Sequence, residues 1–117
     1  MSSTPKVEFY FDTICPWCWM TSRWVADVAD QRGFTVEWHP ISLKILNEGQ
    51  DTGSHADSHL KGLRMGRVIE AARRQHGEAV VGQLYTEFGT RVHPGGRDDA
   101  DGVIAESLAA VGLEASF

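Results

Sequence analysis

The two cysteines of this chain lie two residues apart, as Cys15-Pro16-Trp17-Cys18, and this spacing constrains the chain more than any other feature. An alternating apolar run (Val7, Phe9, Phe11) precedes the motif, and a helical pattern begins inside it. A cysteine at a helix N-terminus has its thiolate stabilised by unpaired backbone N–H groups and by the helix dipole. A second cysteine one turn later can attack a mixed disulfide formed at the first. The motif therefore predicts a redox-active pair that exchanges thiols and disulfides.

The bulk properties of the chain are those of a small globular protein. Its 117 residues suffice for one domain with a modest core. The net charge of −5 argues against a general nucleic-acid-binding surface, and no apolar run approaches the length of a membrane span. The N-terminus enters a strand pattern almost at once, without an apolar signal region, so we expect a cytoplasmic protein. In that compartment a Cys-x-x-Cys pair is kept reduced, which favours catalysis over a structural disulfide.

Hydrophobic periodicity divides the first part of the chain into strand, helix and strand. Alternation predicts a strand over residues 7–12, and a period of 3.6 predicts a helix over residues 16–32. A second strand, rich in β-formers, is expected over residues 35–43, where Pro40 places it at a sheet edge or bulge. This order predicts a right-handed parallel βαβ unit, which we assign to residues 1–46.

Residues 47–117 are expected to form a helical subdomain of about three helices. The polar stretch 47–58 predicts a loop, and three helical patterns follow it. The segment His93-Pro94-Gly95-Gly96 ends the second pattern, and Asp98 or Asp99 can cap the third. The apolar positions that mark the helices of the chain are Met20, Trp24, Val25, Val28, Ala29, Leu60, Leu63, Val68, Ile69, Ala72, Val81, Leu84, Tyr85, Phe88, Val92, Ile104, Leu108 and Val111.

Five segments of the sequence carry a resemblance to a known family. In chain order they read FDTICPWCW, TSRW, SLKILNE, LYTEFGTRVH and VIAESLAAVGL, and they extend from about Val7 to Leu113. Together they resemble the DsbA-like branch of the thioredoxin superfamily, and within it the mycothiol-dependent nitroreductase group of actinobacteria. The resemblance implies an α/β fold in which a thioredoxin-like βαβ unit is followed by the helical subdomain.

The resemblance also implies a chemistry. Cys15 would be the nucleophile and Cys18 the resolving thiol. No cofactor would be bound, and mycothiol or another low-molecular-weight thiol would supply the electrons. Some members of the group pass those electrons to nitroaromatic compounds. The family continues with two antiparallel strands, a cis-proline loop and a last helix, so this chain is expected to match the N-terminal part only. The strand edge left open favours a homodimer.

Three side chains near the cysteines are candidates for shaping the site. Pro16 rigidifies the turn between the cysteines. Trp17 would offer exposed apolar surface beside the sulfurs, suited to a flat or thiol-bearing substrate, although it can equally cover the helix end. Asp12 can shuttle a proton or raise the thiol pKa by like-charge repulsion, or it can be a solvated or capping loop residue.

Candidates from the rest of the chain rest more heavily on the resemblance. A histidine at position 93 can stabilise the thiolate or protonate a leaving group, and the matching segment carries a histidine there, but His93 can also be a surface or capping residue. Asn47 and Glu48 match a family segment and can line the cleft, or they can simply end the second strand in a turn. The glycine-rich stretch after His93 lacks the spacing of a phosphate-binding loop, so no nucleotide is expected.

Three functions remain open at this point. The main expectation is a thiol–disulfide oxidoreductase of the DsbA-like type. The first alternative is a mycothiol-dependent nitroreductase that uses the same pair, and the second is a non-enzymatic module that binds a partner or a metal through this surface. A structural zinc ion needs four ligands and the chain has two cysteines, while nothing in the sequence brings His55 or His59 to Cys15, so no metal is expected at the pair.

Overall fold

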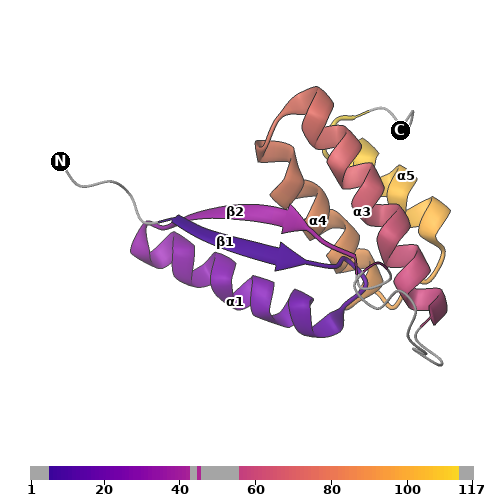
Figure 1. Cartoon of the computed structure of the whole chain (residues 1–117), viewed down its shortest axis with the longest axis horizontal. Helices are drawn as coiled ribbons and strands as arrows, with labels where there is room; N and C mark the ends of the chain where they lie inside the picture. Colours follow the sequence, from indigo (N-terminus) through magenta and orange to yellow (C-terminus); the bar gives the residue numbers. More distant parts are fainter. Residues whose placement is uncertain (1–5, 43–44, 46–55, 114–117) are drawn as a thin grey trace.

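The structure is a computed structural model and describes residues 6–42, 45 and 56–113. It has the mixed α/β architecture expected, a βαβ unit followed by a helical part (Figure 1). No helix within these ranges is both long enough and apolar enough to cross a bilayer. In chain order the elements are β1 (Lys6–Phe11), α1 (Pro16–Arg32), β2 (Thr35–Pro40), α3 (Ala56–His76), α4 (Ala79–Val92) and α5 (Ala100–Ala110).

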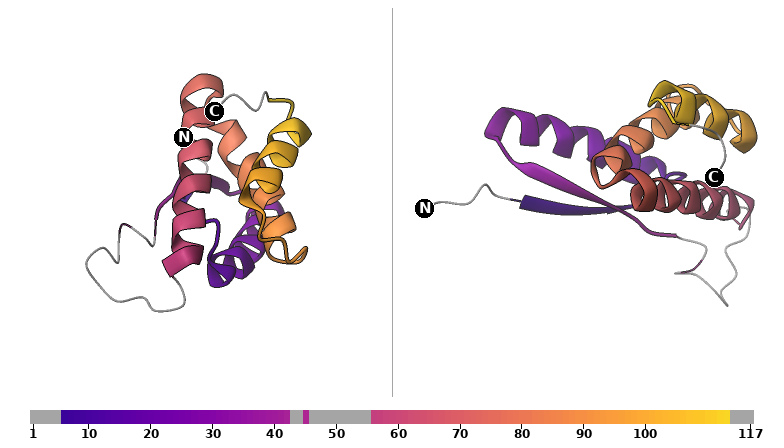
Figure 2. Two further views of the ribbon diagram at one scale, coloured as in Figure 1. Left: turned by 90° about the vertical axis from the view of Figure 1, so that its right-hand side faces the viewer. Right: turned by 90° about the horizontal axis from the view of Figure 1, so that it is seen from above.

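The two strands are parallel, as predicted, and their register separates the side chains into two faces. Phe9 pairs with Trp38, and Glu8 pairs with Glu37. Since neighbouring side chains of a strand point to opposite sides, one face of the sheet is apolar and the other is polar. Helices α1 and α4 lie on the apolar side (Figure 2), and within the described part of the chain no helix covers the polar side.

Helix α4 joins the helical part to the apolar face of the sheet through close aromatic contacts. The ring of Tyr85 stacks on Phe11 with 3.8 Å between centroids, and its centroid lies 5.9 Å from that of Trp38. Gly82 permits this approach, because a Cβ atom at position 82 would lie 2.7 Å from the Trp38 indole. The core is therefore continuous from β1 into the helices.

Helix α1 has the predicted bounds, and Gly33 follows it in the left-handed conformation with φ 73°. Its buried residues include Trp19 and Ala29, whereas Met20 and Trp24 are exposed, Trp24 by 66%. Trp24 is one of the apolar positions that mark the predicted helix, and the sequence pattern therefore places it in the core, but this expectation is wrong. Trp19 and Trp24 lie five residues apart, which is about 140° around a helix, so only one of them can face the core.

Boundaries of β2 and α3 differ from the sequence pattern, and one expected cap is not formed. Helix α3 begins at Ala56, inside the stretch 47–58 for which the sequence predicts a loop. Strand β2 ends at Pro40 rather than at residue 43, because its partner β1 ends at Phe11, which pairs with Pro40; the N–H of Ile41 still donates to the carbonyl oxygen of Phe11 at 2.7 Å. Asp99 occupies the N-cap position of α5 but makes no capping hydrogen bond. Its carboxylate instead accepts two hydrogen bonds from the Arg97 guanidinium, at 2.9 and 2.6 Å, so the charge pair replaces the cap.

Candidate redox site

The cysteine pair lies where β1 ends and α1 begins. Cys15 is the N-cap residue of α1, with φ −81° and ψ 114°, and Pro16 takes the first helical position. The Sγ atom of Cys15 accepts a hydrogen bond from the backbone N–H of Cys18 at 3.4 Å. The backbone N–H of Cys15 donates to the carbonyl oxygen of Asp12 at 3.0 Å. The turn thus directs the backbone N–H of Cys18, which belongs to the first turn of the helix, at the Sγ atom of Cys15.

The two sulfurs occupy different environments, although both cysteines are free thiols of intermediate exposure. The pKa of Cys18 is raised to about 11, chiefly by burial and further by the neighbouring Cys15 sulfur and Asp12 carboxylate, while the backbone of Asp12 opposes the rise. Cys18 is therefore a neutral thiol at pH 7. Cys15 is the sulfur that receives the helix N–H group, so the geometry distinguishes the two cysteines chemically.

Asp12 is fully buried beneath the turn. Its Oδ1 atom accepts a hydrogen bond from the backbone N–H of Ile14 at 3.1 Å. Gly62 of α3 packs directly on this carboxylate, because a Cβ atom at position 62 would lie 2.1 Å from Oδ1. The alternative of a solvated loop residue is therefore wrong. The carboxylate shapes the turn, and its charge contributes to the raised pKa of Cys18.

His93, at the C-terminal end of α4, lies against the same turn. Its Nε2 atom is 2.8 Å from the carbonyl oxygen of Thr13, 80 residues earlier in the chain. Its ring stacks on Trp19, with 5.7 Å between centroids and 26° between planes. Burial lowers the pKa of His93, and the hydrogen bond with Thr13 opposes that change. The hydrogen bond of this imidazole is thus with the backbone of the turn, and its stacking contact is with Trp19.

The structure describes some of the remaining predicted site residues and not others. Trp17, between the cysteines, is 72% exposed, so its indole is available beside the pair. Pro16 is exposed next to it. Asn47, Glu48 and His55 lie outside the described residues.

Comparisons with known proteins assign the chain to a family. The model of a family described as "Mycothiol-dependent nitroreductase Rv2466c" matches residues 14–117, which include both cysteines and His93. The chain belongs to the Rv2466c-like family. It is also 31% identical over 114 residues to the uncharacterized protein Rv2286c of Mycobacterium tuberculosis (strain ATCC 25618 / H37Rv). That match covers 95% of this chain and 49% of the relative, so the chain spans about half the length of that curated protein.

In this member of the Rv2466c-like family, Trp19, Arg23 and Tyr85 support the turn that carries the cysteines, although the sequence alone does not give them this role. The guanidinium of Arg23 lies 4.2 Å from the ring centroid of Trp19, in a cation–π contact. Tyr85 is fully buried, and burial raises the pKa of its hydroxyl, so the phenol stays neutral. The spacing of Trp19 and Arg23, four residues apart in a predicted helix, indicates their contact. Nothing local indicates that Tyr85 packs on Phe11.

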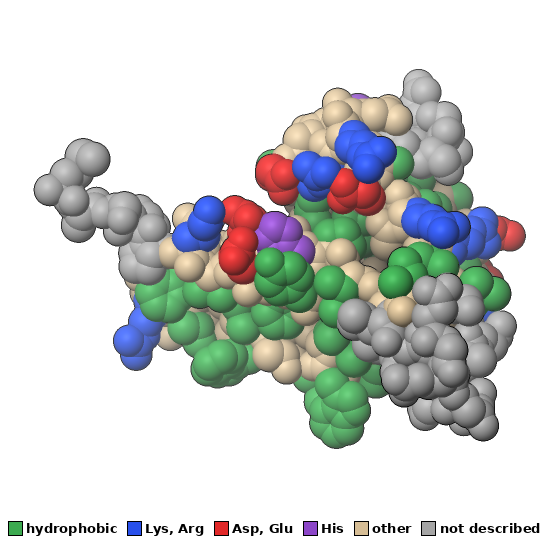
Figure 3. All heavy atoms as spheres, viewed as in Figure 1, with side chains coloured by type: hydrophobic (Ala, Val, Ile, Leu, Met, Phe, Trp, Pro, Cys, Tyr) green, Lys and Arg blue, Asp and Glu red, His purple; other side chains and the backbone are tan. Residues whose placement is uncertain are grey.

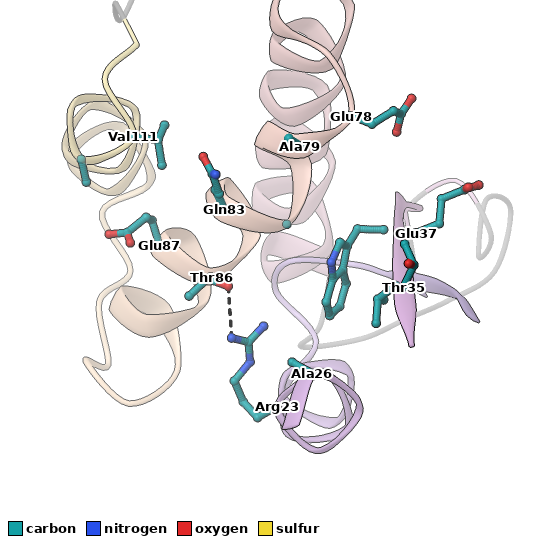
Figure 4. Close-up of a pocket in the computed structure, with 14 residues that line it drawn as sticks. Arg23, Ala26, Thr35, Glu37, Glu78, Ala79, Gln83, Thr86, Glu87 and Val111 are labelled. Atoms are coloured by element: carbon teal, nitrogen blue, oxygen red, sulfur yellow. Dashed lines mark hydrogen bonds between the residues drawn. The ribbon is translucent and has the colours of Figure 1, made fainter. Parts of the chain in front are cut away.

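A separate groove of about 910 Å³ opens between α1 and β2 on one side and α4 and α5 on the other (Figure 4). Arg23, Gln83 and Glu87 are among the side chains that line it, and neither cysteine does. Arg23 donates a hydrogen bond to the Thr86 hydroxyl across it, at 3.1 Å. The cysteine pair therefore lies outside this hollow.

The lowered pKa of His93 predicts a pH-dependent stability. The ordinary pKa is 6.5 and the folded-state pKa is lower, so below pH 6.5 the unfolded chain binds more protons than the folded chain. The free energy of unfolding should fall as the pH drops through 6.5 toward the folded-state pKa. His93→Gln retains a donor for Thr13 and does not titrate, so its fall should be smaller. Urea unfolding at about pH 7.5 and about pH 5 tests this; an equal fall in both proteins would contradict it.

Proposed function

We propose that this chain carries the redox centre of a mycothiol-dependent nitroreductase, formed by Cys15 and Cys18. The observation that supports it most directly is the position of Cys15 at the N-cap of α1, with its sulfur bonded to the N–H of Cys18. The family match over residues 14–117 favours this reading over the DsbA-like disulfide oxidoreductase that was the main expectation. Disulfide exchange by the same pair is kept as the second candidate.

The proposed reaction is a two-electron cycle. The reduced pair gives up two electrons and two protons and becomes a Cys15–Cys18 disulfide. A nitroaromatic compound accepts them, so that the nitro group becomes a nitroso group and one water is released. Two mycothiol molecules then reduce the disulfide, the first by forming a mixed disulfide with one cysteine and the second by displacing it. The products of that half-reaction are the dithiol and mycothiol disulfide.

The different environments of the two sulfurs support different roles. Cys15 is the attacking sulfur in this proposal, because an anion at the N-terminus of a helix is stabilised by the unpaired N–H groups. Cys18, with its pKa raised to about 11, stays protonated until an adjacent sulfur is bonded to a partner. Once Cys15 has formed a covalent adduct with the acceptor, Cys18 attacks the Cys15 sulfur from within the same helical turn, which closes the Cys15–Cys18 disulfide and releases the reduced acceptor. Cys15 therefore attacks first and Cys18 second, because burial raises the pKa of the Cys18 thiol.

The exposed indole of Trp17 supports a nitroaromatic compound as the electron acceptor. Its indole is the most exposed of the large hydrophobic side chains in the described part of the chain, and it lies between the two cysteines in sequence. An exposed indole binds flat aromatic rings by stacking. We assign Trp17 the role of holding a nitroaromatic ring beside Cys15. The cytoplasm, where mycothiol and reduced thiols are found together, is the compartment that fits this chemistry.

The test is a single-turnover reaction of the reduced chain. The 117-residue protein is reduced, freed of excess reductant and mixed either with a nitroaromatic compound or with a small disulfide. We expect the nitroaromatic compound to oxidise both thiols of each chain to the disulfide, and mycothiol to restore them. Thiol titration and the mass of the intact protein report each step.

A variant with both cysteines replaced by serine is the control, and it should not react. Oxidation by the small disulfide but not by the nitroaromatic compound would replace the proposal with the DsbA-like function. A chain whose thiols resist both acceptors would contradict any redox role for the pair in this chain. Circular dichroism of each sample shows that the proteins compared are folded.

A further inference from the structure

The polar face of the sheet, opposite the helices, carries a cluster that the redox proposal does not use. The parallel register places Glu8 directly beside Glu37, and His39 follows two residues later on the same face. The Nε2 atom of His39 lies 2.8 Å from Oε1 of Glu37 and 3.5 Å from Oε1 of Glu8. Figure 3 shows acidic, basic and histidine side chains gathered over the two strands on this face.

We propose that Glu8, Glu37 and His39 form a binding site for one divalent transition-metal cation such as Zn²⁺. Their ligand atoms, one imidazole nitrogen and two carboxylate oxygens, all lie within 4.8 Å of one another. A cation about 2.0–2.2 Å from each ligand atom holds two such atoms no more than about 4.4 Å apart, and the separations of 2.8 and 3.5 Å between the His39 nitrogen and the two carboxylate oxygens meet this limit. An imidazole ligand favours zinc, nickel or copper over magnesium and calcium, which prefer oxygen. Three protein ligands leave further positions for water.

The state of His39 without a metal is an independent reason to assign a ligand here. Its Nε2 atom is shielded from solvent and has no hydrogen-bond partner of suitable geometry, although two carboxylates face it. A bound metal ion would give this nitrogen and the two carboxylate oxygens one common partner.

Two neighbours hold the ligands in place. The Tyr10 ring stacks on the His39 imidazole, with 4.8 Å between centroids and 20° between planes. The Lys6 ammonium lies 3.0 Å from Oε2 of Glu37, which leaves Oε1 directed at His39. Contacts of this kind orient ligands and raise metal affinity. The site is therefore partly organised before a metal arrives.

The test is isothermal titration of the chain with Zn²⁺ near pH 7.5. Because thiolates also bind zinc, every protein in the series carries serine in place of both cysteines. We expect one bound ion for each chain, and at least a tenfold loss of affinity in His39→Ala and in Glu37→Gln. His76→Ala removes an exposed histidine at the end of α3 and is the matched control, with unchanged binding. Mg²⁺ should not displace the zinc.

Absence of zinc binding in the cysteine-free chain would overturn the proposal, as would binding that His39→Ala leaves unchanged. If His39→Ala does not fold, as judged by circular dichroism, Glu8→Gln replaces it, because Glu8 is exposed and its loss should not disturb the fold. The His39 imidazole signals in nitrogen-15 NMR spectra provide a second readout. They should shift on addition of zinc and not on addition of Mg²⁺.

Discussion

Replacing Cys18 by serine should trap a mixed disulfide on Cys15 when the protein reacts with a disulfide such as oxidised mycothiol, whereas replacing Cys15 by serine should abolish the reaction with either acceptor. In Cys18→Ser the attacking sulfur of Cys15 remains, and so does the backbone N–H of residue 18 that donates a hydrogen bond to it. The thiol that would displace the partner is absent, so the adduct accumulates. In Cys15→Ser the remaining thiol is the one whose pKa is raised to about 11, so almost none of it is a thiolate at pH 7.

Mass spectrometry of the intact protein after addition of oxidised mycothiol measures the outcome. The Cys18→Ser protein should gain the mass of one mycothiol, and the Cys15→Ser protein should gain none. Reversed behaviour, with the adduct on Cys18, would contradict the assignment of the two roles. It would leave the redox function itself intact, which the wild-type single-turnover reaction tests separately.

Gly89→Ala is expected to be the most destabilising small substitution in the helical part. A Cβ atom at position 89 would lie 2.1 Å from the ring of Trp19. That indole cannot move aside freely, because His93 stacks on it and Tyr85 meets it edge-on at 5.8 Å. Helices α1 and α4 must therefore separate. Overpacking of this kind costs about 2–3 kcal/mol of the free energy of unfolding, or roughly 8–12 °C in Tm.

Gly66→Ala is the matched control, since it makes the same change inside helix α3. A Cβ atom at position 66 would lie 4.0 Å from the Pro40 Cβ, which is an ordinary contact. Because alanine favours a helix over glycine by about 1 kcal/mol, this variant should be as stable as the wild type or more so. Thermal unfolding followed by circular dichroism compares the two. Equal stability of both variants would show that Trp19 is not confined as described.

Local signals in the sequence were enough to place the elements. The alternation before the cysteines, Pro16 at the start of α1 and Gly33 at its end together predict β1 and the bounds of α1. Gly77, with φ 93°, and the break after His93 separate the later helices as predicted. These features depend on residues that are adjacent in the chain, so the sequence alone is enough to predict them.

Contacts between residues far apart in the chain could not be predicted from the sequence. The sequence could not show that Trp19, rather than Trp24, faces α4, because α1 carries large apolar residues on two sides. It could not show that Gly62 packs on the Asp12 carboxylate, because only the packing of α3 on the turn brings them together. The cysteine pair itself was evident from spacing, whereas the residues that support it were not.

The contact between His93 and Thr13 has a consequence for the way this protein is made. Synthesis begins at the N-terminus, so both cysteines leave the ribosome long before the helix end that fastens their turn, 80 residues after Thr13. In the folded chain Cys18 packs against the core cluster, which includes residues of α4, and until that core forms the thiol lacks the burial that raises its pKa to about 11. The nascent chain therefore passes through a period in which its second thiol is more reactive than it will be afterwards, and completing the helices protects it.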